Sequence, residues 1–309
     1  ETVRTAARLS KADLTTLVVK EFTDLQGVMG GIYARRERHP DAVWKAIYDQ
    51  YRPASGSDDP PREASGAILS LADRFDSLGA LFRIGLVPTG SKDPYGLRRA
   101  ALGAVAIAIG RNWRTDWRPI ARKALSLLPS DLPGPGADEV IDELGRFFAD
   151  RLRSLLERRG YAYDEISAVL NVGVWDFADA ADRARALSEA RRHMDFRSLI
   201  LAFKRIRNIV GSDSPGEPRP ELYREDAERG LAADFLQARQ AIAGFVAERH
   251  YREAMETIAS IAPSLDRYFV DVLVNCPEEE LKRNRLALLA SIQKEFTSLA
   301  DFSEIVVEK

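Results

Sequence analysis

The sequence predicts an all-α protein. Nearly every segment repeats its apolar residues with the 3.6-residue period of a helix, and no segment shows the alternation of a half-buried strand. Stretches rich in proline and glycine separate the helical segments. The strongest is PSDLPGPG (129–136), where three prolines and two glycines in eight residues cannot continue a helix. We therefore expect an N-terminal helical bundle over 1–130, a helical linker region over 131–190 and a C-terminal helical domain over 191–309.

The helices of the N-terminal part are predicted from their apolar faces. A helix over 11–28 is expected to bury Leu14, Leu17, Val18, Phe22 and Leu25. A helix over 63–84 is expected to bury Ile68, Leu71, Ala72, Phe75, Leu78 and Phe82. A third helix, over 94–110, begins at Pro94, which is favoured in a first helical turn, with Asp93 as the expected N-cap. Two more helices are expected at 41–51 and 115–128.

The remaining helices follow in order, with a long loop at 211–220 (GSDSPGEPRP) inside the last part. A second proline- and glycine-bearing loop, YRPASGSDDPPR (51–62), separates two helices of the first part. The periodic segments of the middle and C-terminal parts predict helices at 137–159, 163–171, 176–189, 195–210, 220–248, 251–273 and 278–300.

The composition restricts the class of protein. Apolar residues make up 45% of the chain and charged residues 30%, which is typical of a globular protein. The 45 basic residues are balanced by 47 acidic ones, so a nucleic acid would have to be held by a local basic patch. The single cysteine, Cys276, excludes a disulfide framework and a cysteine zinc cluster, and it fits a reducing cytoplasm. No apolar run is long enough to span a membrane, and the chain starts at Glu1 without a signal peptide, as a piece of a longer protein would.

The stretch GLVPTGSKDP (85–94) is similar to a phosphate-binding loop, GxxxxGK[ST]. The order of Ser91 and Lys92 is reversed, however, Pro88 removes a backbone donor, and the preceding segment is helical instead of a buried strand. We interpret it as a helix connector. Three basic residues nevertheless crowd the following helix N-terminus, where they oppose the helix dipole and are suited to an RNA phosphate: Lys92, Arg98 and Arg99.

Two C-terminal helices carry further basic residues. In FRSLILAFKRIRNIV (196–210), the face opposite the apolar stripe carries Arg197, Lys204 and Asn208, with Arg205 adjacent and Arg207 at its edge. No acidic residue shares this face between Arg197 and Asn208. This face is either simply solvated or an RNA-binding surface. The helix 278–300 has three basic residues near its start, Lys282, Arg283 and Arg285, which either pair with the acidic residues 278–280 or contact RNA.

Several long motifs resemble the β subunit of the bacterial heterotetrameric glycyl-tRNA synthetase. They are LSKADLTTLVVKEFTDLQGVMGGIYARR (9–36), SLADRFDSL (70–78), PTGSKDPYGLRRAALG (88–103), AFKRIRNIV (202–210) and KRNRLALLASIQKEFTSLADFSEI (282–305). They run in order along the chain, so the resemblance covers essentially all of it and implies the C-terminal part of a longer subunit. The region 9–110 would be an HD-like helical domain. The last part would be an anticodon-binding domain similar to that of arginyl-tRNA synthetase.

The resemblance implies a tRNA-binding role. The chain would bind tRNA-Gly and read its anticodon within an α2β2 heterotetramer in the cytoplasm. The α subunit would use ATP and Mg²⁺, and this chain alone would be catalytically inactive. Under this interpretation the basic residues of both C-terminal helices become candidate tRNA contacts, with Lys and Arg on phosphates and Asn208 on a base edge.

A hydrolase and a scaffold are the alternatives. An HD phosphohydrolase needs histidines and aspartates around a metal ion. Only Asp13, Asp73 and Asp76 remain as vestigial carboxylates, and Ala12 stands where the paired histidine would be. The chain's histidines (His39, His193 and His250) form no HD pair, and no metal site is predicted. The other alternative is a helical protein-interaction scaffold without affinity for tRNA.

Overall fold

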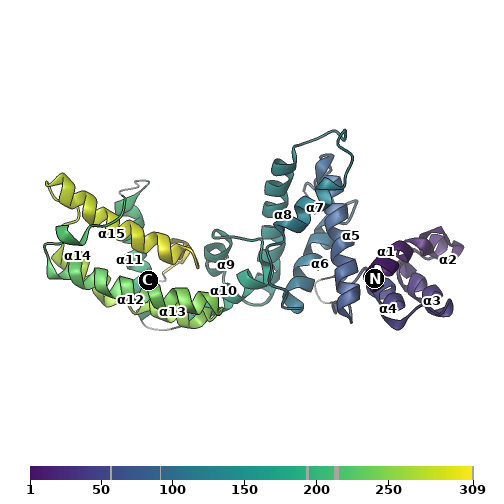
Figure 1. The fold of residues 1–309 in the computed structure, drawn as a ribbon, viewed down its shortest axis with the longest axis horizontal. Helices are drawn as coiled ribbons and strands as arrows, with labels where there is room; N and C mark the ends of the chain where they lie inside the picture. The colour runs from purple at the N-terminus through teal and green to yellow at the C-terminus, as the bar shows by residue number, and fades with distance from the viewer. Residues whose placement is uncertain (56–57, 91, 193–194, 212–215, 308–309) are drawn as a thin grey trace. The chain divides into compact units, whose positions relative to one another are not determined.

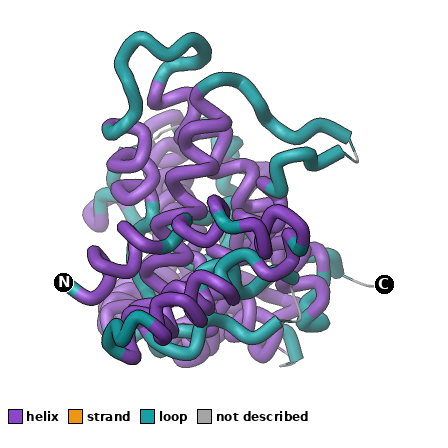
Figure 2. The backbone as a smooth tube through the Cα atoms, turned by 90° about the vertical axis from the view of Figure 1, so that its right-hand side faces the viewer, coloured by secondary structure: helices purple, strands orange, loops and turns teal. Residues whose placement is uncertain are grey.

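The computed structural model describes residues 1–55, 58–90, 92–192, 195–211 and 216–307. Across these residues every regular element is a helix and none is a strand, which confirms the all-α prediction (Figures 1 and 2). The chain forms two compact units. Unit 1 consists of residues 1–155 and 174–178, and unit 2 of residues 156–173 and 179–309. The three-part division at 130 and 190 stays a prediction.

Unit 1 begins with short helices where one helix over 11–28 was predicted, and that prediction is wrong. Thr16 is extended and its side chain accepts a hydrogen bond from the Val19 amide, so a new helix starts there. The predicted apolar face lies outside the core: Leu17 is 82% exposed and Phe22 61% exposed, and Leu14 and Val18 are exposed too. The elements are α1 (Thr2–Leu9), η1 (Ala12–Thr15), α2 (Leu17–Glu21), η2 (Thr23–Leu25), α3 (Val28–Arg36) and α4 (Asp41–Asp49).

Helices α3 and α4 pack closely because α3 carries glycine at their contact. A Cβ atom on Gly31 would lie 2.6 Å from the Cβ of Tyr48, so a larger residue would push the helices apart. The small core beneath them consists of Ala6, Ala34, Val43, Ala46, Ile47 and Leu69. Three of these side chains are alanines, which bury little area each, and close backbone approach compensates for their size.

The larger core of unit 1 is aromatic. Phe75 stacks on Trp117 at 5.8 Å between ring centroids and contacts Phe148 at 5.6 Å. Most of the predicted face of 63–84 is buried, but Ile68 and Ala72 are exposed. The helices that enclose this core are α5 (Ala64–Arg83), α6 (Leu97–Gly110), α7 (Arg118–Ser126) and α8 (Ala137–Arg158), whose last residues belong to unit 2.

Unit 2 follows the predicted order of helices with two corrections. The helix predicted over 220–248 starts only at Asp226, after a 3₁₀ turn (η3, Pro220–Leu222). The helix predicted over 251–273 is two helices, because Pro263 begins a new first turn after Ser260 and Ile261. The elements are α9 (Tyr163–Leu170), α10 (Phe177–Ala190), α11 (Asp195–Val210), α12 (Asp226–Ala247), α13 (Tyr251–Ala259), α14 (Ala262–Asp271), α15 (Glu279–Thr297) and η4 (Phe302–Glu304).

The segment 299–306 ties the end of unit 2 to its beginning. The Val306 amide donates to Asp164 Oδ2 at 2.7 Å, and Arg191 donates to the Val306 carbonyl at 3.0 Å. The Asp301 amide donates to the Ala168 carbonyl, and Arg183 reaches the Leu299 carbonyl. Unit 2 is therefore closed by contacts between residues more than 100 positions apart in sequence. Among the described residues, no helix combines the length and the apolar character that crossing a bilayer requires.

Candidate nucleic-acid interface

Helix α11 buries the apolar stripe that its sequence predicted. Phe203 contacts Phe296 of α15 and Phe302 of η4, with ring centroids 5.9 and 5.3 Å apart, and Phe196 contacts Phe302. The stripe, all of it buried, consists of Phe196, Leu199, Ile200, Phe203, Ile206 and Val210. Because this face is fixed against α15 and η4, the opposite face of α11 is presented to solvent.

The solvent face of α11 brings together the polar residues predicted for RNA. Arg197, Arg205 and Asn208 are exposed, and Lys204 is half-buried. Arg197, Lys204 and Asn208 form no side-chain hydrogen bond or ion pair with other described residues. Their donors are therefore available to a ligand, and two of the three side chains are cationic.

Arg205 is held in place by an aromatic ring that the sequence analysis did not include. Its guanidinium lies 4.2 Å from the ring centroid of Phe269, in α14. A cation over an aromatic face is stabilised electrostatically, and the contact still leaves the in-plane N–H donors of arginine pointing outward. The side chain is thus ordered before a ligand arrives. Phe269 was missed because it lies 64 positions after Arg205 in the sequence. The sequence around it indicates only an apolar position in a helix.

Arg207 departs from the prediction of an unneutralised basic face. Its guanidinium hydrogen-bonds the Ser303 hydroxyl and lies 3.6 Å from Glu304 Oε1. Both partners come from η4, and a search for acidic residues along α11 alone could not find them. The available positive charge of α11 is therefore concentrated on Arg197, Lys204 and Arg205.

The start of α15 does not show the pairing within the helix that was one of its two alternatives. The acidic residues expected to pair within the helix bind arginines from elsewhere: Glu278 binds Arg224 at 2.5 Å and Glu280 binds Arg219 at 2.7 Å. Lys282 is half-buried, and Arg283 is exposed beside Arg219. Lys282 and Arg283 thus remain candidate contacts, and their role stays a prediction.

Arg285 lies inside unit 2 instead of on its surface. It is 5% exposed, and its Nε atom donates to Glu228 Oε1 at 2.9 Å while Nη1 donates to the Leu273 carbonyl. Burial opposes ionisation of Glu228, but hydrogen bonds from Arg285 and from the Glu225 and Arg224 amides outweigh it and keep the pKa of Glu228 below its ordinary value. This geometry gives Arg285 a structural role, contrary to the predicted tRNA contact.

The loop before α6 is a capped connector, as the sequence indicated. Asp93 accepts hydrogen bonds from the Leu97 and Arg98 amides, although the helix starts at Leu97 and not at Pro94. Arg98 donates to the carbonyls of Lys92, Gly90 and Pro88, so it holds the loop together and its predicted phosphate contact is not supported. Lys92 and Arg99 are exposed. Ser91 lies outside the described residues.

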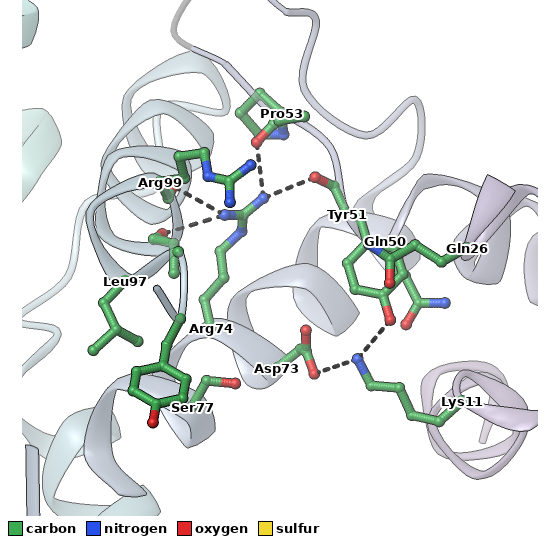
Figure 3. Close-up of a pocket in the computed structure, with 14 residues that line it drawn as sticks. Lys11, Gln26, Gln50, Tyr51, Pro53, Asp73, Arg74, Ser77, Leu97 and Arg99 are labelled. Carbon is green, nitrogen blue, oxygen red and sulfur yellow. Dashed lines mark hydrogen bonds and ion pairs between the residues drawn. The ribbon is translucent and has the colours of Figure 1, made fainter. Parts of the chain in front are cut away.

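The vestigial carboxylates do not converge on a common point. Asp13 is buried, and its Oδ2 accepts hydrogen bonds from the Gly27 and Gly30 amides. Asp73 binds Lys11 Nζ at 2.8 Å, and Lys11 also donates to the Tyr51 hydroxyl (Figure 3). Asp76 is exposed. No group of three or more histidine, cysteine or acidic side chains among the described residues is placed to hold a metal ion, and His193 lies outside them.

Two family models match the chain. The model of the glycyl-tRNA synthetase beta subunit matches residues 1–171, and the model of the DALR anticodon binding domain matches residues 199–302. The second range contains the whole solvent face of α11 except Arg197, together with Phe269 and the basic residues of α15. Lys92, in the loop before α6, and Arg99, in the first turn of α6, fall in the first range.

The curated relatives carry one name. The chain is 37% identical to the glycine–tRNA ligase beta subunit of Myxococcus xanthus over 99% of its own length and 45% of the relative's. It is 40% identical to that of Acidobacterium capsulatum, over 97% of this chain and 44% of the relative. It is 35% identical to that of Syntrophus aciditrophicus, over 99% of this chain and 44% of the relative. The chain thus spans a little under half the length of these relatives.

Proposed function

Because the chain belongs to the glycyl-tRNA synthetase β subunit family, we propose that it binds tRNA-Gly and reads the anticodon. Aminoacylation itself is assigned to the α subunit, which would activate glycine with ATP and Mg²⁺ and transfer it to the 3′ end of the tRNA. In this proposal the chain works in the cytoplasm within an α2β2 assembly. It supplies position and specificity, and none of its residues takes part in the chemical steps.

The observation that carries this proposal is the solvent face of α11. It lies within the segment matched by an anticodon-binding model and offers Lys204, Arg205 and Asn208 on a helix whose other face is locked by aromatic packing. A rigid scaffold positions donors without a large entropic cost on binding. The face therefore supports binding of an RNA loop by residues that are already ordered.

Each side chain would have its own task. Lys204 and Arg197 are cations suited to phosphates, which position an RNA without reading its sequence. The Asn208 amide offers both a donor and an acceptor, the pair of groups that a base edge requires. Arg205, stacked on Phe269, presents a planar guanidinium on which an unpaired base can stack.

The test is a titration of the chain with tRNA-Gly and with the same tRNA carrying a substituted anticodon, at several salt concentrations. We expect affinity to fall as salt rises, and the substituted tRNA to bind about tenfold or more weakly, since a misread base costs about 1–3 kcal/mol. Lys204→Ala is expected to weaken both tRNAs and to reduce the salt slope by about 1.

Lys123, an exposed residue of α7, provides the matched control. Lys123→Ala should leave affinity and salt slope unchanged. Equal affinity for the two tRNAs would contradict anticodon reading and leave a nonspecific RNA-binding protein. If no tRNA binds at any salt concentration, the chain is a scaffold and the proposal fails altogether.

A further inference from the structure

Unit 1 contains a polar cavity that the tRNA-binding proposal does not use. Its volume is about 330 Å³, at the lower end of the range of about 300–1,000 Å³ that is typical of small-molecule sites. The start of α6, the middle of α5 and the segment that follows α4 (residues 50–54) form its walls, with Lys11 at one side (Figure 3). The cavity lies wholly within one compact unit, so its shape is set by the packing of that unit.

The charges that line the cavity do not balance. Three cations (Lys11, Arg74 and Arg99) face a single carboxylate, Asp73. Lys11 binds Asp73 directly, so these two charges cancel. Arg74 and Arg99 remain, and no described acidic side chain forms an ion pair with either of them.

Arg74 is a buried cation with only neutral partners. All five of its N–H donors are used: Nε binds the Ser70 hydroxyl, and the two terminal nitrogens bind four backbone carbonyls. Desolvation lowers the pKa of Arg74 to about 10, so the side chain still carries its charge at neutral pH. The arrangement fixes a positive charge at the cavity wall. An anion bound beside it would offset the energetic cost of burying that charge.

The close approach that creates this arrangement depends on one glycine. A Cβ atom on Gly103 of α6 would lie 2.3 Å from Nη1 of Arg74, so only glycine lets the helix backbone close over the guanidinium. Arg99 lies one turn earlier on the same helix and is exposed, with donors that no described group accepts. Arg74 thus contributes charge alone, and Arg99 contributes both charge and hydrogen bonds.

The remaining lining groups suit the organic part of a ligand. Ser77 and Gln26 offer hydroxyl and amide groups, and the ring of Tyr95 lies 57% exposed at the cavity. We propose that this cavity binds a phosphomonoester of the nucleotide type, with its dianionic phosphate between Arg74 and Arg99 and its base near Tyr95. A phosphate with two negative charges matches the two guanidinium groups, neither of which forms an ion pair with a described acidic side chain.

The proposal is tested by calorimetric titration of the chain with AMP, inorganic phosphate and adenosine. We expect AMP to bind with a Kd of about 1 mM or tighter, phosphate to bind more weakly, and adenosine not to bind. Arg99→Gln should weaken AMP binding at least about fivefold because it removes one charge and its donors. Asp73→Asn should tighten AMP binding about threefold, because it removes the one carboxylate at the cavity and leaves the positive charge of Lys11 without its partner.

The opposite signs of these two variants separate a phosphate site from a general loss of structure. Arg146→Gln, at an exposed arginine of α8 in the same unit, is the matched control and should leave AMP affinity unchanged. Absence of saturable AMP binding at about 10 mM, or unchanged affinity in Arg99→Gln, would overturn the proposal.

A free nucleotide and the 5′-terminal phosphate of an RNA, which is a phosphomonoester, present the same chemistry to the cavity. Saturating tRNA-Gly distinguishes them: if it abolishes AMP binding in the wild type, the occupant is the tRNA, and if AMP still binds, the occupant is a free nucleotide. Both outcomes uphold the phosphate site. The result is independent of the anticodon titration, which concerns residues of unit 2.

Discussion

Helices α11 and α15 have sequences of the same kind, with an apolar stripe on one face and a group of basic residues beside it. In the folded chain their arginines differ. Arg205 lies on the surface over a phenylalanine ring, whereas Arg285 is buried against Glu228. Periodicity identified the apolar face in both helices. What separates the two arginines is where a residue distant in sequence lies, a phenylalanine in one helix and a glutamate in the other.

The largest effect is expected from removing the buried ion pair between Arg285 and Glu228. Glu228→Gln leaves the Arg285 guanidinium buried without a counter-charge, and we expect unit 2 to lose about 3–5 kcal/mol of unfolding free energy. All four tryptophans (Trp44, Trp113, Trp117 and Trp175) belong to unit 1. The urea midpoint measured by tryptophan fluorescence should therefore stay unchanged. The part of the circular-dichroism transition that is due to unit 2 should move to a lower urea concentration.

The control is Glu280→Gln, which breaks the exposed pair with Arg219. That change should cost only about 0–1 kcal/mol. Equal effects of Glu228→Gln and Glu280→Gln would show that the buried pair contributes no more unfolding free energy than a surface pair. The burial of Arg285 would then not distinguish α15 from α11 energetically.

A smaller effect is expected from pH. Hydrogen bonds from arginine and from backbone amides outweigh the opposing effect of burial and keep the pKa of both Glu228 and Asp164 below their ordinary values. Their stabilisation is therefore fully present above the unfolded-state pKa values of about 4.3 and 3.9, and it is lost as pH falls through the folded-state values. Each unit of lowering is worth about 1.4 kcal/mol.

Acid titration of unfolding measures this loss directly. Asp164→Asn should flatten the decline of unit 2 stability below about pH 4, because the variant no longer takes up that proton on unfolding. A decline of the same steepness in the variant and the wild type would mean that Asp164 does not contribute to acid sensitivity.

The smallest effect is expected from substitutions of Arg205 on the solvent face of α11. Arg205→Ala should weaken tRNA-Gly binding about tenfold, and Arg205→Lys about threefold, because lysine keeps the charge but loses the planar stacking on Phe269. Filter-binding titrations at fixed salt measure both affinities. If lysine restores full affinity, only charge matters at this position; if alanine has no effect, Arg205 is not part of the interface.

The sequence predicted much of the fold and less of the site. Long amphipathic helices such as α5 and α11 were found because their apolar spacing is a local property. The prediction of one helix over 11–28 was wrong because the Thr16 and Asp13 side chains accept hydrogen bonds from the Val19 and Gly27 amides. These bonds divide the segment into short turns, which apolar spacing cannot reveal. The family was recognised from quoted motifs and is confirmed by the matching family model. Glu228 and Glu304 were missed as partners of Arg285 and Arg207 because each lies more than 50 positions away.

The contact between Val306 and Asp164 also has a consequence for the order of synthesis. The two residues are 142 positions apart, so a ribosome adding about 5–20 residues per second needs about 7–28 seconds to travel from one to the other. During that interval unit 1 can already fold, while unit 2 waits for its closing segment with the apolar stripe of α11 uncovered. A chaperone that shields apolar helices during translation would therefore encounter unit 2 far longer than unit 1.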